Sequence, residues 1–252
     1  MKVLAVILLV YFALSAYLFF AQRNFIYFPT PKTQHTYLEE TYTFEDATVR
    51  VIVLNEGKPN ALLYFGGNAE SVEHNAPAFI QHFPNHTLYL MQYRGYGSST
   101  GKPTEANLYA DALAVFDQIQ PRHERISVIG RSLGSGIATF LAAQKPVQSV
   151  VLITPFDSIE AVAKKLFPFF PVSLLLQDKY NSLENAKRIQ APTLLLVAEN
   201  DQTVNAVHSE NLAKAFMPSV ATTTVIPASG HNSITYHPQY YSSIQSFIPS
   251  SL

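Results

Sequence analysis

Three side chains in this sequence, a serine, an aspartate and a histidine, have the types and the chain order that nucleophilic acyl transfer requires. Ser132 is the middle residue of the segment Gly-Arg-Ser-Leu-Gly at 130–134, which follows a β-branched apolar run and precedes an apolar helical pattern. A strand, a tight turn and a helix in this order form a nucleophile elbow, which strains the serine backbone and presents its hydroxyl at a helix N-terminus. Strand and helix nearly touch there, so the residues two before and two after the serine must be small, and both are glycine. The alternative is an ordinary Gly/Ser turn.

A base and an orienting acid are needed beside this serine, because its hydroxyl is a poor nucleophile until a positioned base takes the proton. Active sites of parallel sheets lie at the carboxyl ends of the strands. Asp201 directly follows a predicted strand at 193–198, and His231 directly follows the last predicted strand at 222–226. The order Ser, Asp, His is the one that accompanies a nucleophile elbow. We therefore predict Ser132 as nucleophile, His231 as base and Asp201 as acid.

The acid and the base each have an alternative interpretation. Asp201 would otherwise be a turn or cap residue, and His231 a surface-loop residue. Asp157, which follows the preceding strand, is a reserve candidate for the acid, although it would equally cap the helix that begins near Ser158. Glu199 is a weaker reserve.

An oxyanion hole requires two N–H donors aimed at the charge that develops on the substrate. One donor is expected from Leu133, the residue after the nucleophile. The second is expected from the loop 66–69 after the buried strand 61–65, because its glycines let the backbone approach a substrate closely. We predict Asn68 as this donor, with Ala69 as the second choice. The alternative is a glycine turn that only caps a helix.

No cofactor and no metal site are expected. The glycine-rich loop 94–101 lacks a Gly-Lys-Ser/Thr segment and the Gly-x-Gly-x-x-Gly spacing, so it is interpreted as a scaffold turn rather than a nucleotide site. His82 and His86 are four residues apart, but Pro84 between them argues against a helical metal pair. The sequence has no cysteine, which excludes disulfides, thiolate metal sites and a cysteine nucleophile.

The sequence around these candidates alternates predicted strands and helices, which is typical of a mostly parallel sheet with helices on both faces. Two short strands at 41–44 and 50–55 are predicted to pair antiparallel at a sheet edge. The alternation predicts one α/β catalytic domain over 41–252. Its predicted helices include 104–119, 206–216 and 238–247.

The segment 155–188 departs from this alternation. Prolines at 168 and 171 break its apolar runs into short predicted helices. We interpret it as a small apolar lid over the site, and core packing is the alternative. The residues predicted to line an acyl pocket under this lid are Phe167, Phe169, Phe170 and Leu174.

The N-terminus is the compositional outlier of the chain. Residues 3–21 carry no charge, and Ser15 alone lies outside the hydrophobic set, so a helix there would rise about 28 Å, close to the thickness of a bilayer. A cleaved signal peptide is the alternative, but the segment Phe-Phe-Ala at 19–21 puts a bulky residue where cleavage needs a small one. We predict a transmembrane anchor over 1–22, a stiff linker over 23–40, and a single-pass protein of the cell membrane with its catalytic domain outside.

Charge and composition restrict the partners. The net charge of −1 and the lack of a basic stripe argue against nucleic acid. With 48% hydrophobic and 14% charged residues, the composition is that of a globular or membrane-associated protein. The oligomeric state is left open.

Taken together, these motifs resemble those of α/β-hydrolase-fold serine hydrolases, in particular the small membrane-anchored branch that includes protein depalmitoylases and related bacterial esterases. The resemblance covers nearly everything after the anchor and rests on the segments 65–69, 93–101, 130–134, 199–201 and 230–232. It implies ester or thioester chemistry without a cofactor, with Ser132, Asp201 and His231 as the triad. Depalmitoylases of this branch reach membranes through lipidated N-terminal cysteines, whereas this chain has no cysteine and an apolar helix instead.

The sequence therefore predicts a serine hydrolase that cleaves small-molecule or lipid acyl esters or thioesters through an acyl-enzyme on Ser132. Two other functions stay open: a serine peptidase or aminoacyl hydrolase on the same fold, and a catalytically silent, membrane-tethered binding module. Epoxide hydrolase and dehalogenase chemistry is excluded, because it needs a carboxylate where Ser132 stands.

Overall fold

A single eight-stranded sheet forms the centre of the protein in the computed structural model, which describes residues 1–248. Its strand order is β1-β2-β4-β3-β5-β6-β7-β8. The strands are β1 (Leu38–Thr43), β2 (Thr48–Leu54), β3 (Asn60–Phe65), β4 (His86–Gln92), β5 (Arg125–Arg131), β6 (Val150–Ile153), β7 (Thr193–Ala198) and β8 (Ala221–Ile226). β1 pairs antiparallel with β2, and β2 antiparallel with β4, while every other pair is parallel. The predicted antiparallel edge and mostly parallel sheet are confirmed.

The two faces of the sheet support separate apolar layers. In β3, Leu63 and Phe65 belong to one layer and Leu62 and Tyr64 to the other, as expected for side chains that alternate along a strand. The first layer packs under α3 (Glu105–Ile119), α4 (Leu133–Ala142), α7 (Ser182–Ala186) and α8 (Ala206–Ala215). The second packs under α2 (Ala76–His82) and α9 (Gln239–Phe247). All six residues of β3 are buried, because helices cover both faces of a parallel sheet.

Short 3₁₀ turns and polar caps connect these elements. The turns are η1 (Val72–Asn75), η2 (Gln120–Arg122) and η3 (Ile234–Tyr236). Thr104 caps α3 by accepting the N–H of Asn107 at 3.1 Å, as its position before the helix predicts.

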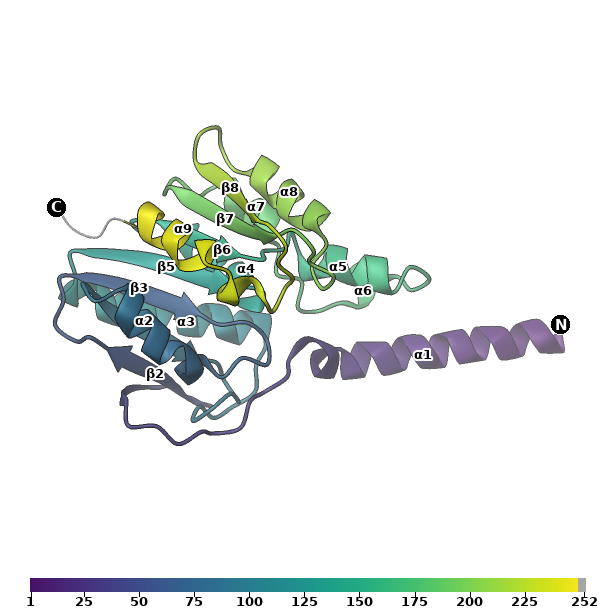
Figure 1. Cartoon of the computed structure of the whole chain (residues 1–252). Helices are drawn as coiled ribbons and strands as arrows, with labels where there is room; N and C mark the ends of the chain where they lie inside the picture. The colour runs from purple at the N-terminus through teal and green to yellow at the C-terminus, as the bar shows by residue number, and fades with distance from the viewer. Residues whose placement is uncertain (249–252) are drawn as a thin grey trace.

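The N-terminal helix α1 (Lys2–Ile26) leaves the body of the molecule as a long rod (Figure 1). Its length and apolar composition are sufficient to cross a membrane. It continues to Ile26, beyond the predicted anchor end at residue 22, and β1 already begins at Leu38, inside the predicted linker 23–40. The helix continues because Gln22 and Arg23 have partners in the segment that follows β6. Of the predicted catalytic domain, residues 249–252 lie outside the described part of the chain.

The segment between β6 and β7 divides into two parts. The helices α5 (Ile159–Leu166) and α6 (Val172–Leu175) extend from the sheet in the same direction as α1 (Figure 1). The remainder of the predicted lid does not, because Tyr180 and Ala186 are buried in the first apolar layer. We use the name lid for residues 159–176, which is shorter than the predicted 155–188.

Candidate active site

The turn between β5 and α4 has the strained geometry predicted for Ser132. Its backbone lies at φ 48° and ψ −115°, a region that non-glycine residues seldom adopt. A Cβ on Gly130 would lie 2.4 Å from the carbonyl oxygen of Gly134, and one on Gly134 would lie 2.1 Å from that of Phe65. Both distances are shorter than atoms can approach, so the two flanking glycines are steric requirements of the turn.

The three predicted catalytic side chains meet at the carboxyl edge of the sheet. His231 Nε2 lies 2.9 Å from Ser132 Oγ, and His231 Nδ1 lies 2.8 Å from Asp201 Oδ2. The second carboxylate oxygen of Asp201 accepts the N–H groups of Thr203 and Val204 at 2.9 and 2.8 Å. The carboxylate is therefore fixed by the turn after β7, and it orients the imidazole toward the hydroxyl.

The reserve acids lie elsewhere. Asp157 is buried and accepts a hydrogen bond from His208, with 2.8 Å between Oδ1 and Nδ1. Glu199 accepts the N–H of Ala228 at 2.8 Å. Neither contacts His231 within the described residues. Over residues 1–248, no group of three or more potential ligands could hold a metal ion.

Of the two oxyanion candidates in the loop after β3, the geometry favours Asn68 over Ala69. The N–H of Ala69 is already donated to Asn68 Oδ1 at 3.1 Å. Within residues 1–248, no protein acceptor is hydrogen bonded to the backbone N–H of Asn68 or to that of Leu133. The side chain of Asn68 contacts the end of α1, because its amide donates to the Ile26 carbonyl at 2.7 Å and its oxygen accepts the Phe28 N–H at 2.9 Å.

A largely buried ion pair that the sequence analysis did not single out joins the loops around Ser132, Asn68 and His231. Arg131 Nη1 lies 2.7 Å from Glu70 Oε2, and Arg131 also donates to Asn232 Oδ1 at 3.2 Å. Glu70 in turn accepts the Gly67 N–H at 2.6 Å and the Tyr64 hydroxyl at 2.5 Å. The elbow, the oxyanion loop and the histidine loop are thus tied together.

The electrostatics of this ion pair favour the charged state. Burial alone would raise the pKa of Glu70, but the charge of Arg131 and the hydrogen bonds from Tyr64 and Gly67 outweigh it. The pKa of this carboxyl therefore lies below its ordinary value of 4.5. The sequence offered one sign of this ion pair, since Glu70 and Arg131 are charged residues close to the glycines at 66–67 and 130.

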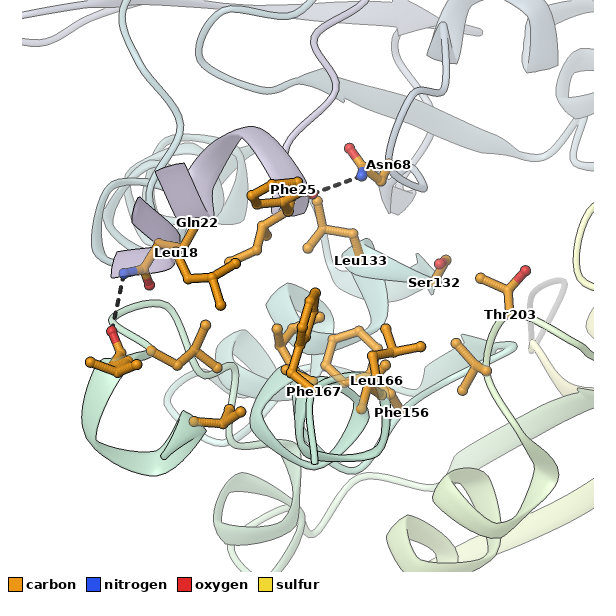
Figure 2. Close-up of a pocket in the computed structure, with 18 of the residues that line it drawn as sticks. Leu18, Gln22, Phe25, Asn68, Ser132, Leu133, Phe156, Leu166, Phe167 and Thr203 are labelled. Atoms are coloured by element: carbon orange, nitrogen blue, oxygen red, sulfur yellow. Dashed lines mark hydrogen bonds between the residues drawn. The ribbon is translucent and has the colours of Figure 1, made fainter. Parts of the chain in front are cut away.

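An apolar pocket of about 330 Å³ opens on Ser132 (Figure 2). Phe167 and Phe170 line it as predicted, but Phe169 and Leu174 do not, because their side chains are 84% and 83% exposed on the outside of the lid. The proline-broken lid has no single helical period, so neighbouring aromatic residues point to opposite sides.

One wall of this pocket comes from the N-terminal helix, which the sequence analysis treated only as an anchor. The contributing residues of α1 are Leu18, Gln22, Phe25 and Ile26 (Figure 2). A glutamine at the end of a long apolar run was the available sign that this end of the helix meets protein.

Comparison with known proteins agrees with this architecture. Residues 51–174 match the family model described as alpha/beta hydrolase fold. An uncharacterized protein of Mycobacterium tuberculosis strain H37Rv is 35% identical over 181 residues, which are 70% of this chain and 64% of that protein. The chain thus spans slightly less than two thirds of that relative's length. Alpha/beta hydrolase domain-containing protein 17B of Homo sapiens is 29% identical over 207 residues, which are 77% of this chain and 69% of the relative.

Solved structures give the same fold. An esterase of Pyrococcus furiosus superposes with a TM-score of 0.69 at 19% identity, over 87% of this chain and 98% of that one. A hydrolase of Pseudomonas aeruginosa gives a TM-score of 0.65 at 19% identity, over 83% of this chain and 97% of that one. The chain is an α/β-hydrolase-fold protein. Within that class, it is similar to the relatives named alpha/beta hydrolase domain-containing protein 17B.

Proposed function

We propose that this protein is a serine hydrolase that cleaves carboxylic esters or thioesters through an acyl-enzyme on Ser132. The observation that carries the proposal is the chain of contacts from Ser132 Oγ through His231 to Asp201, with heavy-atom distances of 2.9 and 2.8 Å, beside an apolar pocket. Nucleophile, base and orienting acid are then within hydrogen-bond reach without any movement of the protein.

Acylation begins when Ser132 Oγ attacks the carbonyl carbon of the substrate and His231 Nε2 takes the hydroxyl proton. The carbonyl oxygen becomes an oxyanion, which the N–H groups of Leu133 and Asn68 would stabilise; loss of one such donor typically costs about 10²–10³ in rate. The carboxylate of Asp201 stabilises the imidazolium. As the intermediate collapses, His231 returns the proton to the departing alcohol or thiol, and the acyl group stays on Ser132.

Deacylation repeats these steps with water. His231 removes a proton from a water molecule, whose oxygen attacks the acyl carbon, and the second tetrahedral intermediate uses the same two N–H donors. Collapse returns the proton from His231 to Ser132 Oγ and releases the carboxylic acid. No cofactor enters this cycle.

The pocket lining supports an acyl substrate over a peptide or an aminoacyl compound. No residue that lines this pocket carries a charge, so the lining offers no carboxylate to a substrate's amino group. Apolar walls with a few polar groups at one end are typical of sites that hold a hydrocarbon chain against a reacting head.

Labelling with a fluorophosphonate and turnover of p-nitrophenyl butyrate test this proposal. We expect wild-type protein to label and to release nitrophenol, and we expect Ser132→Ala to lose labelling and to lower kcat by about 10⁶-fold. Ser242→Ala, which removes an exposed hydroxyl from α9, is the matched control and should behave as wild type. Undiminished labelling of Ser132→Ala would contradict the assignment. A folded protein without labelling or turnover would instead indicate the silent binding module.

The same proposal includes the membrane. We infer that α1 crosses the cell membrane once, as its length and apolar composition support, and we propose that the catalytic domain lies on the outer side. Protease treatment of intact cells tests the side, because an outward-facing domain is cleaved without lysis and an inward-facing one is protected.

A further inference from the structure

Polar contacts hold the lid and the two residues that follow it, Gln177 and Asp178, against the C-terminal end of α1. Gln22 donates to the Leu175 carbonyl at 3.0 Å and accepts the Gln177 N–H at 2.7 Å. Arg23 Nε lies 3.0 Å from Asp178 Oδ2, and that carboxylate is almost completely buried. Gln22 and Arg23 of α1 thus have their polar partners on Leu175, Gln177 and Asp178. The end of α1 and this segment therefore form one unit rather than a body and a separate anchor.

A second contact lies much further along α1. The Tyr11 hydroxyl donates to the Phe169 carbonyl at 3.1 Å, and the Tyr11 ring stacks on Phe170 with 5.5 Å between centroids. Tyr11 precedes Ala21, the end of the apolar run, by ten residues, which is about 15 Å along a helix. If α1 spans a bilayer, the lid tip beside Tyr11 therefore reaches the depth of the hydrocarbon.

The outer surface of the lid has the composition that this position requires. Phe169 and Leu174, which do not line the pocket, are 84% and 83% exposed, although each is large and apolar. Exposure of this kind marks a membrane or protein contact rather than an ordinary water-facing surface. Lys164 and Lys165 lie in the last turn of α5, and their long side chains can extend the charge to the lipid headgroups.

Much of the backbone of the lid tip is hydrogen bonded, which favours hydrocarbon, where each unpaired polar group costs several kcal/mol. Among the described residues, the N–H of Phe169 has no acceptor. The prolines at 168 and 171 have no N–H to satisfy. The N–H groups of Phe167, Phe170 and Val172 all have backbone acceptors within the lid, at 2.8–3.1 Å. The hydrogen bond from the Tyr11 hydroxyl to the Phe169 carbonyl gives both of these polar groups a partner.

We propose that the lid enters the bilayer alongside α1, and that a fatty acyl chain passes from the hydrocarbon to Ser132 through the pocket between them. The inference rests on the proposed esterase or thioesterase function and names its substrate class, an acyl ester or thioester dissolved in the membrane. Leu18 and Phe25 of α1 and Phe167 and Phe170 of the lid are the facing walls of this pocket. The fatty acyl chain moves from lipid into an equally apolar cavity and is never exposed to water, while the ester or thioester carbonyl reaches the polar end of the pocket at Ser132.

Tryptophan fluorescence tests the depth of the lid. The chain has no tryptophan, so Phe169→Trp creates a unique probe in full-length protein reconstituted into vesicles. We expect brominated phosphatidylcholine to quench its emission at least twofold relative to unbrominated vesicles. Val225→Trp, at a 54% exposed site on β8, is the matched control and should not be quenched. Equal emission of Phe169→Trp in both vesicles would overturn insertion of the lid.

A chain-length series tests the pocket wall. Leu18→Trp fills the pocket from α1, whereas Phe20→Trp places the same ring on an 83% exposed position of the helix. We expect Leu18→Trp to lower kcat/KM for vesicle-borne p-nitrophenyl palmitate at least tenfold and to leave p-nitrophenyl butyrate within about twofold, and Phe20→Trp to change neither. Palmitoyl thioesters in the same vesicles distinguish the two leaving groups.

The outcomes separate this inference from the function on which it rests. Failure of wild-type protein to hydrolyse butyrate would overturn the esterase function itself. Normal butyrate turnover with palmitate turnover unaffected by Leu18→Trp would overturn only entry along α1. An equal loss for both chain lengths would likewise overturn entry along α1, because Leu18 would then not act on the acyl chain.

Discussion

The polar rim at the carboxyl edge of the sheet and the apolar pocket wall beside it are built in different ways. At the rim, Ser132, His231 and Asp201 follow β5, β8 and β7 and are fixed by hydrogen bonds of 2.8–2.9 Å. At the wall, α1 and the lid present mostly apolar side chains to a cavity, and their polar contacts lie outside the reacting groups. The difference indicates that the sheet positions the groups for the proposed reaction and that α1 and the lid shape the cavity beside them.

The largest expected effect is on the rim. Asp201→Asn would keep the shape of the site but leave the imidazole without its orienting charge, so we expect kcat to fall by about 10⁴-fold for every acyl length. Asp157→Asn is the matched control, since it alters the other buried Asp–His pair and should leave kcat nearly unchanged. Steady-state kinetics on butyrate and palmitate esters measure both. The reverse result would make Asp157 the acid and displace the rim from its assigned position.

An intermediate effect is expected at the Glu70–Arg131 ion pair, which connects the loops of the rim. Glu70→Gln removes the charge that pairs with Arg131, and breaking a buried pair typically costs about 3–5 kcal/mol of stability. Because the folded pKa of Glu70 is lowered, its stabilisation is fully present above the unfolded pKa and is lost as the pH falls through the folded pKa. Denaturant unfolding of wild type and Glu70→Gln should therefore differ at neutral pH and converge as the pH falls below the folded pKa of Glu70, which lies under 4.5. A difference that does not change with pH would show that the pair contributes shape rather than charge.

The smallest effect belongs to the wall. Phe170→Ala removes a ring from the pocket, for which we expect kcat/KM on palmitate esters to fall about tenfold while butyrate turnover changes little. Phe169→Ala deletes the same ring from the outer face of the lid and should leave both substrates unaffected in detergent. Equal effects of the two variants would remove the distinction between the inner and outer faces of the lid.

The sequence was sufficient to predict that Ser132, Asp201 and His231 lie together at the rim, because their order along the chain and their places after strands determine it. Asp201 and His231 each directly follow a strand, and parallel strands bring their carboxyl ends together, so no knowledge of side-chain packing was needed. Phe169 and Phe170 could not be distinguished in the same way. Two prolines interrupt the lid, and without a continuous helical period the sequence does not indicate which ring faces inward.

The pocket wall formed by α1 and the Glu70–Arg131 ion pair both depend on contacts between segments that are distant in the sequence. Gln22 meets Leu175 across 153 positions, and Arg131 meets Glu70 across 61. Local patterns identify helix and strand but do not identify such partners. For the same reason the sequence did not show that α1 continues to Ile26, where Gln22 and Arg23 contact the segment after β6.

Asn68 has a practical consequence for anyone who wishes to study a soluble form. Its side chain is bonded to the Ile26 carbonyl and to the Phe28 N–H, while its own main-chain nitrogen is a proposed oxyanion donor. A fragment trimmed of its first 28 residues would be easier to purify but would lack both of these partners. Rate constants from that fragment would describe a loosened loop, so enzymology on this protein calls for the intact polypeptide in lipid or detergent.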